Sequence, residues 1–599
     1  GGSWATAPWG WPDAGSKIAA PSPPELSMSI TGGFSISTNH DGQFDRSSWT
    51  VREVVTKIAG PHELRFGGDV FRVYNHTVNV YQQAGSFTFS GQLSGDGMAD
   101  FIVGRASGFN QGGGEFKYLK GTQWAFFVQD DWRVGQRLTV NLGVRWDPYL
   151  PYYDREGRVI CFQPGVQSTR YPKAPAGLTY GGANHDSGCP VGGAENTWSN
   201  IAPRIGFAYR VTRDAKTSLR GGTGYFYTPP PLFGFFNQFT NTAPFAPTFS
   251  FNDVAFEDPF GSVGVRNPFP QEYGPRVPGP EVAFTVPTRI QGSIDREYRI
   301  MQYGSWNLMI ERQVRASWLL RATYQGNKGT FLSGGREMNP AVYVPGASTV
   351  GNTQARRPFR NFSQVSKTES GLNSHHHGLL LNIEKRFGHG LTVLANHSWQ
   401  KTIMDSYTNP FSRRWGRGIS QDDIAHTFKF SNVYQAPDTK LRGIAGHVVN
   451  GWSLNSILVW RGGFPLTIAS GVDNAFTGTG SQRADYLGGN ARLASGRPRQ
   501  DQLRQWFDTS RFTVNAIGTF GNSGSGILRG PKSFNTNLGV LKNFRVTEQT
   551  KLQFRAEFFN VLNHPNFFEP NTTVTSAQFG RISSADSPRI MQFGLKVLF

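Results

Sequence analysis

The sequence lacks any run of apolar residues that could form a membrane-spanning helix. Such a helix needs about 20 consecutive apolar residues, and no stretch of the 599 residues approaches that length. Long runs of Ala, Leu, Glu and Lys, which favour helices, are missing as well. A helical membrane protein is therefore excluded. A membrane barrel is not, because its strands alternate between apolar and polar side chains.

Cysteine is scarce, and its two occurrences lie close together. Cys161 and Cys189 fall in one Gly- and Pro-rich segment. An even pair within one loop indicates a disulfide made in an oxidising compartment, with two free thiols as the alternative. The first residues show neither an initiator methionine nor the charged and apolar regions of a signal peptide. We therefore expect a mature or truncated chain.

Recognisable patterns for catalysis or metal binding are missing too. The histidines His375–His377 alternate between the two faces of a strand, and no Cys, Asp or Glu beside them completes a metal site. Asp422, Asp423 and His426 lead into a predicted strand, which favours a structural role over a catalytic or calcium-binding one. The glycines at 521–526 lack the Lys-Ser/Thr of a phosphate loop. We expect no enzymatic activity, no metal and no cofactor.

Acidic residues are outnumbered by basic ones. The chain has 60 Lys and Arg against 41 Asp and Glu, a net charge of +19. The basic residues are scattered singly, without the clusters that nucleic-acid binding requires. They are better explained as side chains of loops and of a polar lumen, and an anionic lipid or saccharide surface is a further possible partner. No nucleic-acid partner is expected.

What the sequence does contain is many strand-like segments. It has 72 Gly and 36 Pro, and 14% of its residues are aromatic, a composition typical of an all-β sandwich, propeller or barrel. The segments occur in pairs, such as "QWAFFVQDDWRV" with "RLTVNLGVRWD" and "GLLLNIEKRF" with "LTVLANHSWQK". Each is about ten residues long, the length with which a tilted strand crosses a bilayer.

The connections between these segments alternate in length. Turns within a pair are a few residues long, whereas connections between pairs are long. Long loops on one side only are the pattern of an outer-membrane barrel. The long loops are expected at about 150–200, 229–297, 328–374, 402–424, 465–533 and 563–588.

Apolar and polar side chains alternate within single strands. In "KLQFRAEFFN", the charged pair Arg555 and Glu557 would be costly in a dry core, whereas a wet lumen accommodates it. The alternate residues of this strand would then face lipid: Leu552, Phe554, Ala556 and Phe558. Gln553 would face the lumen with the two charges.

The last strand follows the same pattern and ends on an aromatic residue. One face carries Met591, Phe593, Leu595, Val597 and Phe599. Terminal residues of a soluble protein are seldom an ordered apolar strand unless something holds them. The pattern predicts that this face lies against lipid.

One loop stretch, "FGFFNQFTNTAPFAPTFSF", is rich in aromatic and polar residues. It could hold a saccharide or a peptide, or it could pack against its neighbours. The sequence leaves both possibilities open, and no other ligand-binding residues can be assigned from it.

Several segments together resemble a known family. They are "APRIGFAYRV", "LRGGTGYFY", "LLLNIEKRFGHGLTVLANHSWQKT", "WFDTSRF", "GTFGNSGSGILRGP", "FRAEFFNVLNHPNF" and "FGRISSADSPRIMQFGLKVLF". In this order they resemble the barrel of TonB-dependent receptors, in the large Oar-like branch, from about residue 50 to the end.

The resemblance implies an all-β, antiparallel transmembrane barrel in the outer membrane of a Gram-negative bacterium. It implies import, or in some members export, of a bulky ligand with energy from the TonB complex. It also implies that the outer-membrane assembly machinery recognises the terminal strand, with Phe599, Val597, Leu595 and Phe593 as the signal. Membrane lipid and lipopolysaccharide are then the surroundings of the barrel.

The family's plug, TonB-contacting segment and N-terminal extension are not visible in the sequence. We count about 16–18 strands against about 22 in such transporters. We therefore expect an irregular segment at 1–24 and an N-terminally truncated barrel at 25–599.

Two other classes fit the sequence less well. An extracellular all-β binding or adhesion protein would be soluble, with the apolar faces of its strands packed inward. A secreted carbohydrate-active enzyme would need paired carboxylates at a cleft, which the spacing does not offer.

Overall fold

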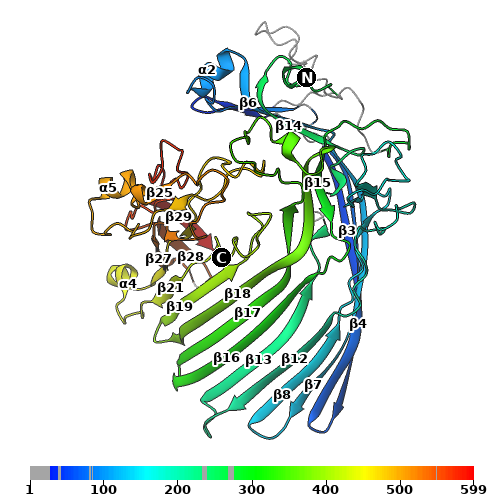
Figure 1. Ribbon diagram of the computed structural model, residues 1–599. Coiled ribbons are helices and arrows are strands. Elements are labelled where there is room, and N and C mark those ends of the chain that lie inside the picture. Colours follow the sequence, from blue (N-terminus) through cyan, green and yellow to red (C-terminus); the bar gives the residue numbers. More distant parts are fainter. Residues whose placement is uncertain are drawn as a thin grey trace.

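The computed structural model describes residues 27–599 apart from 38–41, 80–82, 84, 233–238, 268–275 and 548. The predicted irregular segment 1–24 lies outside the described residues, as does part of the aromatic loop stretch. One sheet of eighteen strands forms a tall curved wall (Figure 1). This sheet agrees with the 16–18 strands expected from the sequence.

The long strands of the wall pair in the order in which they occur in the chain, each antiparallel to the next. They are β3 (Gly42–Ala59), β4 (His62–Asn79), β7 (Glu115–Arg133), β8 (Leu138–Trp146), β12 (Ile201–Arg210), β13 (Thr217–Thr228), β16 (Met301–Arg315), β17 (Trp318–Glu337), β18 (Phe362–Gly388), β19 (Leu391–Met404), β21 (His426–Gln435), β22 (Trp452–Arg461), β27 (Ser533–Arg545), β28 (Lys551–Phe559) and β29 (Ile590–Leu598). Three short strands complete the sheet: β9 (Tyr153–Asp154), β15 (Thr288–Ile294) and β20 (Gly418–Ile419).

The wall has a turn end and a loop end. At the turn end the connections are short, such as 60–61 between β3 and β4 and 389–390 between β18 and β19. At the loop end they are long, such as 147–200 and 462–532. This is the one-sided pattern that the sequence predicts.

Two strands extend further than predicted. The loop expected at 328–374 is shorter, because β17 continues to Glu337 and β18 begins at Phe362. Their pairing shifts register between Gly329 and Leu332 and again before Gly334. Such irregularities break the period of two, so the continuation does not appear as an alternating pattern in the sequence.

Cross-strand pairing places the apolar residues of the wall on one face. Phe554 pairs with Leu595, and Ala556 pairs with Phe593, so these side chains share a face. Phe593 is 63% exposed and Leu595 is 68% exposed. The apolar face therefore points outward, as predicted, and the opposite face of the wall points inward.

A small separate sheet lies beyond the loop end of the wall (Figure 1). Its strand order is β14 (Thr248–Ala255), β6 (Arg105–Gly112), β5 (Ser86–Phe89), β1 (Ser27–Ile30) and β2 (Ser35–Ser37). Its core includes Phe87, Phe89 and Phe109, all buried. The segment "LSMSITGGFSIS", expected to belong to the barrel, forms β1 and β2 of this sheet instead. Strands of three or four residues are too short to cross a bilayer.

Helices are few and short in the described residues. The segment "GMADFIVGR" contains the helix α2 (Gly97–Ile102), and the Asp96 side chain caps it by accepting from the Met98 and Ala99 amides. No helix in the described part of the chain has the length and apolar character needed to cross a membrane. The remaining elements are β10 (Ile160–Phe162), β11 (Leu178–Tyr180), β23 (Pro465–Leu466), β24 (Asp485–Tyr486), β25 (Phe512–Thr513), β26 (Leu528–Arg529), α4 (Gly443–Val449), α5 (Arg499–Arg504), η2 (Gly261–Val263), η3 (Gln354–Arg356) and η4 (Thr509–Arg511).

Candidate functional site

The inner face of the wall carries interlocking charges. Arg145 on β8 donates to both carboxylate oxygens of Asp69 on β4, at 2.9 and 3.2 Å. Its Nε donates to Asp147 at 2.6 Å. Arg52 on β3 approaches the same Asp69 at 3.6 Å. These residues come from separate strands, and the pairing of the strands brings them together.

Similar ion pairs recur nearer the turn end. On β4, Arg65 pairs with Glu63 and lies 3.5 Å from Asp131 of β7. On β17, Arg321 donates to Glu311 of β16 at 2.6 and 2.8 Å. Charges placed in a dry interior cost several kcal/mol each unless they are well paired. Their number on one face indicates a hydrated inner surface.

A recess of about 600 Å³ opens on this inner face. Arg52, Arg145, Arg204, Asn141 and Asn307 contribute to its lining. Among its polar groups are three guanidinium groups, and apolar side chains such as Phe127 and Ile205 complete the lining. The guanidinium and amide groups can hold polar or anionic groups.

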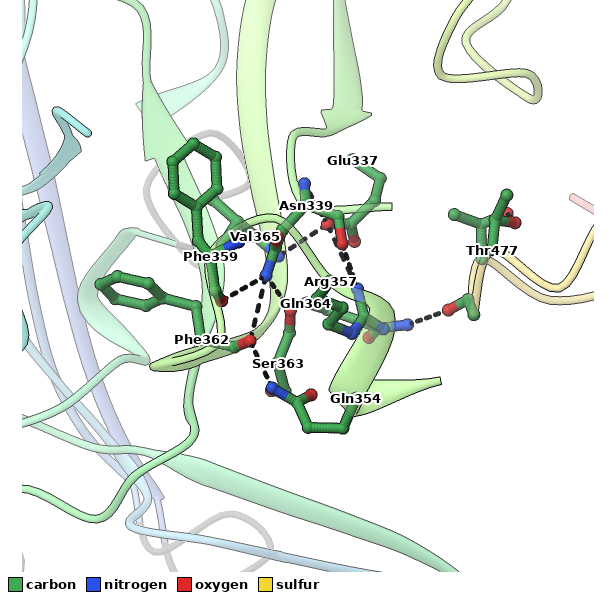
Figure 2. A network of polar contacts seen from close by, with 12 residues as sticks. Glu337, Asn339, Gln354, Arg357, Phe359, Phe362, Ser363, Gln364, Val365 and Thr477 are labelled. Atoms are coloured by element: carbon green, nitrogen blue, oxygen red, sulfur yellow. Dashed lines mark hydrogen bonds and ion pairs between the residues drawn. The ribbon is translucent and has the colours of Figure 1, made fainter. Parts of the chain in front are cut away.

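A buried polar network fixes the loop between β17 and β18 (Figure 2). The Asn339 side chain is fully buried, and its amide donates to the carbonyls of Phe359, Phe362 and Ser363 at 2.9–3.0 Å. The carboxylate of Glu337 accepts from the amides of Asn339 and Val365, at 2.8 and 2.9 Å. One asparagine therefore ties together backbone groups 20 to 24 residues away.

The same network joins this loop to the loop between β22 and β27. The Ala341 amide donates to the Thr477 carbonyl at 2.9 Å, and the Gln364 side chain donates to the Gly478 carbonyl at 3.0 Å. Arg357 donates to the Asn339 carbonyl, and burial lowers the pKa of this arginine. Two loops far apart in sequence thus form one packed structure.

A polar pocket of about 260 Å³ lies beside this network. Arg289, Glu337, Gln364, Tyr407 and Thr479 are among its lining residues. Burial lowers the pKa of Arg289 while the charge of Glu337 raises it. Burial is the larger of the two effects, so the pKa of this arginine is lowered overall. The pocket offers hydrogen bonds in several directions, as recognition of a polar ligand requires.

The loop containing the two cysteines is cross-linked in the structure. Cys161 and Cys189 form a disulfide, with their Cα atoms 5.7 Å apart. Close by, the buried carboxylate of Asp186 accepts from Ser168 at 2.7 Å, Thr169 at 2.8 Å and Tyr180 at 2.9 Å. Burial raises the pKa of Asp186, but these hydrogen bonds outweigh it and lower the pKa below its ordinary value.

Three of the histidine and acidic residues considered from the sequence have side-chain hydrogen-bond partners. His376 hydrogen-bonds to Thr402 at 2.9 Å and His377 to Tyr324 at 2.8 Å. Asp423 accepts from Arg529 at 2.5 Å. Within the described ranges, no three His, Cys, Asp or Glu residues are grouped so that they could hold a metal ion.

In the part that the structure describes, the aromatic loop stretch packs against neighbouring residues. Phe239 and Phe245 are almost fully buried in two core clusters under the loops. The adjoining residues 233–238 lie outside the described residues. The polar pocket beside Tyr407 was not predicted, because its residues come from five separate segments.

Comparison with protein families shows which family this chain belongs to. The outer membrane beta barrel domain family matches residues 3–592. The chain belongs to this family. It is therefore a protein of the cell outer membrane, and its apolar outward face is the face in contact with lipid. In such barrels the long loops are extracellular and the short turns periplasmic.

Two solved structures match most of this chain at low sequence identity. The outer membrane transporter YddB from Escherichia coli is 10% identical over 96% of this chain and 57% of its own, with a TM-score of 0.49. The ferric yersiniabactin uptake receptor FyuA from Yersinia pestis is 8% identical over 93% of this chain and 54% of its own, with a TM-score of 0.41. The chain thus spans little more than half the length of these structures. No curated protein matches it.

Proposed function

We propose that this chain is the barrel portion of an outer-membrane transporter of the TonB-dependent type, in the Oar-like branch. It moves a bulky polar ligand, a saccharide or a peptide, across the outer membrane with energy from the TonB complex. The observation that carries the proposal is the contrast between the two faces of the wall. The outer face is apolar, and the inner face carries the ion pairs around Asp69 and Arg145.

The extracellular pocket supports a ligand rich in hydrogen-bonding groups. Tyr407 and Thr479 supply hydroxyl groups, and Arg289 supplies a charge at the pocket wall. The chemistry suits the hydroxyl groups of a saccharide or the amides of a peptide. The protein has a transport role and no catalytic one under this proposal.

The test is uptake by cells of a panel of fluorescent oligosaccharides and peptides. We expect at least one probe to enter wild-type cells, and its entry to stop when the gene is deleted or TonB is removed. Uptake that is unchanged by both deletions would contradict the proposal.

The pocket is tested in the same assay with the double substitution Tyr407→Phe and Thr479→Ala. Loss of two hydrogen bonds should weaken binding of the transported probe about tenfold. The substitution Gln421→Ala changes an exposed residue of another loop and serves as the control, for which uptake should be unchanged.

A further inference from the structure

One connection at the turn end differs from the others. The neighbouring turns comprise residues 60–61, 134–137, 211–216, 316–317, 389–390 and 546–550, whereas β21 and β22 are joined by residues 436–451. This segment, here called the α4 turn, contains the helix α4. In Figure 1, α4 projects from the side of the wall. The α4 turn is much longer than a tight hairpin turn, which would be enough to connect the same two strands.

The α4 turn is an ordered structure. The Asn450 side chain accepts from the amide and hydroxyl of Thr439, at 2.6 and 2.8 Å, and donates to the Thr439 carbonyl at 3.2 Å. The Gly451 amide donates to Asp438 at 3.0 Å. These bonds tie the start of the turn to its end and hold the helix between them.

Contacts with the wall place the end of α4 on the lipid-facing side. Trp452 and Lys542 pair across β22 and β27, and Lys542 pairs in turn with the outward-facing Phe554. The Trp452 indole donates to the Val448 carbonyl at 2.8 Å, and the Lys542 ammonium donates to it at 3.1 Å. Both outward-facing side chains therefore bond to the last turn of the helix.

A lysine on the lipid-facing side needs polar partners, and these contacts provide them. Lys542 is 2% exposed, and it also donates to the Asn450 carbonyl. Its ammonium lies 4.9 Å from the ring centre of Trp452. The free carbonyls at a helix C-terminus attract a cation, so the α4 turn stabilises the charge of Lys542 at the edge of the apolar face.

The free side of α4 is apolar. Ile444 is 85% exposed and Val448 is 60% exposed, and their spacing of four residues puts them on one stripe of the helix. Leu441, just before the helix, is exposed as well. Lys440 and Arg442 flank this stripe. Apolar side chains on one face with basic residues beside them are typical of a helix that lies in a membrane interface.

We propose that the α4 turn is a membrane anchor that inserts Leu441, Ile444 and Val448 into the periplasmic leaflet of the outer membrane. The stripe continues the lipid-facing belt through Trp452, so both meet the same bilayer. Lys440 and Arg442 lie at the level of the phosphate groups. The anchor fixes the height and tilt of this part of the wall, and it does not depend on what the barrel transports.

The test uses a fluorescent label on a single introduced cysteine, because the two native cysteines are joined to each other. The full-length protein with Ile444→Cys, labelled with nitrobenzoxadiazole, is reconstituted into bilayers containing brominated phosphatidylcholine. The control is Arg213→Cys, an exposed residue of the short turn 211–216. We expect strong quenching by the brominated lipid at 444 and little at 213, with iodide in the buffer giving the opposite order.

Val448→Cys, on the same stripe, should repeat the result if Ile444→Cys fails to fold. Equal quenching by iodide at the stripe and at 213 would overturn the proposal. So would protection from both quenchers, which would show that a protein surface covers the stripe. Neither result bears on transport, so the anchor and the proposed function fail separately.

Discussion

At the scale of single residues, Asp186 shows how much of a loop one buried carboxylate can organise. It accepts from groups 6–18 residues away, including Ser168 and Tyr180. The cysteine pair beside it can be identified from the sequence because cysteine is scarce. Asp186 cannot be identified from the sequence, because nothing in its sequence neighbourhood distinguishes it from an exposed aspartate. Its role appears only when the loop is folded.

We expect Asp186→Asn to lower the free energy of opening of this loop by about 2 kcal/mol, because a neutral amide replaces a charged acceptor of several hydrogen bonds. Hydrogen exchange at the amides of Thr169 and Tyr180 measures the effect. Asp422→Asn, at an exposed position, is the control and should leave that exchange unchanged.

Acid should have a similar effect on the native loop. The pKa of Asp186 is lower in the folded loop than its ordinary value of about 4. Its contribution to stability is therefore complete above that ordinary value and is lost as the pH falls through the folded pKa. The measurement is the protection of these two amides relative to their intrinsic exchange at each pH, which should fall as the pH drops below the ordinary value. Protection that stays constant on acidification, or falls only above pH 5, would contradict this account.

At the scale of elements, the alternating strands were predictable and the loop-end structure was not. Strands with a regular period of two are present in the wall where the sequence indicates them, as in β28 and β29. The small sheet of β1, β2, β5, β6 and β14 depends on pairing between segments far apart in the sequence, such as β1 with β5 and β6 with β14. Local periodicity carries no information about such contacts.

The last strand, β29, gives a prediction of its own. The residue that follows it, Phe599, is 99% exposed, so removal of this side chain costs no packing within the chain. If it is the assembly signal, Phe599→Ala should lower the amount of protein in the outer membrane several-fold. Phe411→Ala, at another exposed phenylalanine, is the control. Equal outer-membrane amounts of both variants in fractionated cells would contradict the prediction.

At the scale of the whole molecule, the direction of the strands limits how the sheet can close. Among the described residues, β3 and β29 each have a residue-by-residue pairing with one neighbouring strand. The neighbour of β3 is β4, and the neighbour of β29 is β28. The series from β3 to β29 alternates in direction over an odd number of strands, so its first and last members run the same way. An antiparallel closure between them requires an odd number of further strands.

The central claim is that apolar side chains of the wall face lipid while their neighbours face the lumen. Val128 and Gln129 are adjacent on β7, and Val128 is on the face of the exposed Phe126. Single cysteines at these two positions, spin-labelled in the reconstituted protein, can be tested for collision with a relaxation agent dissolved in the bilayer. The account predicts frequent collision at 128 and little at 129. Frequent collision at 129, or the same frequency at both positions, would contradict it.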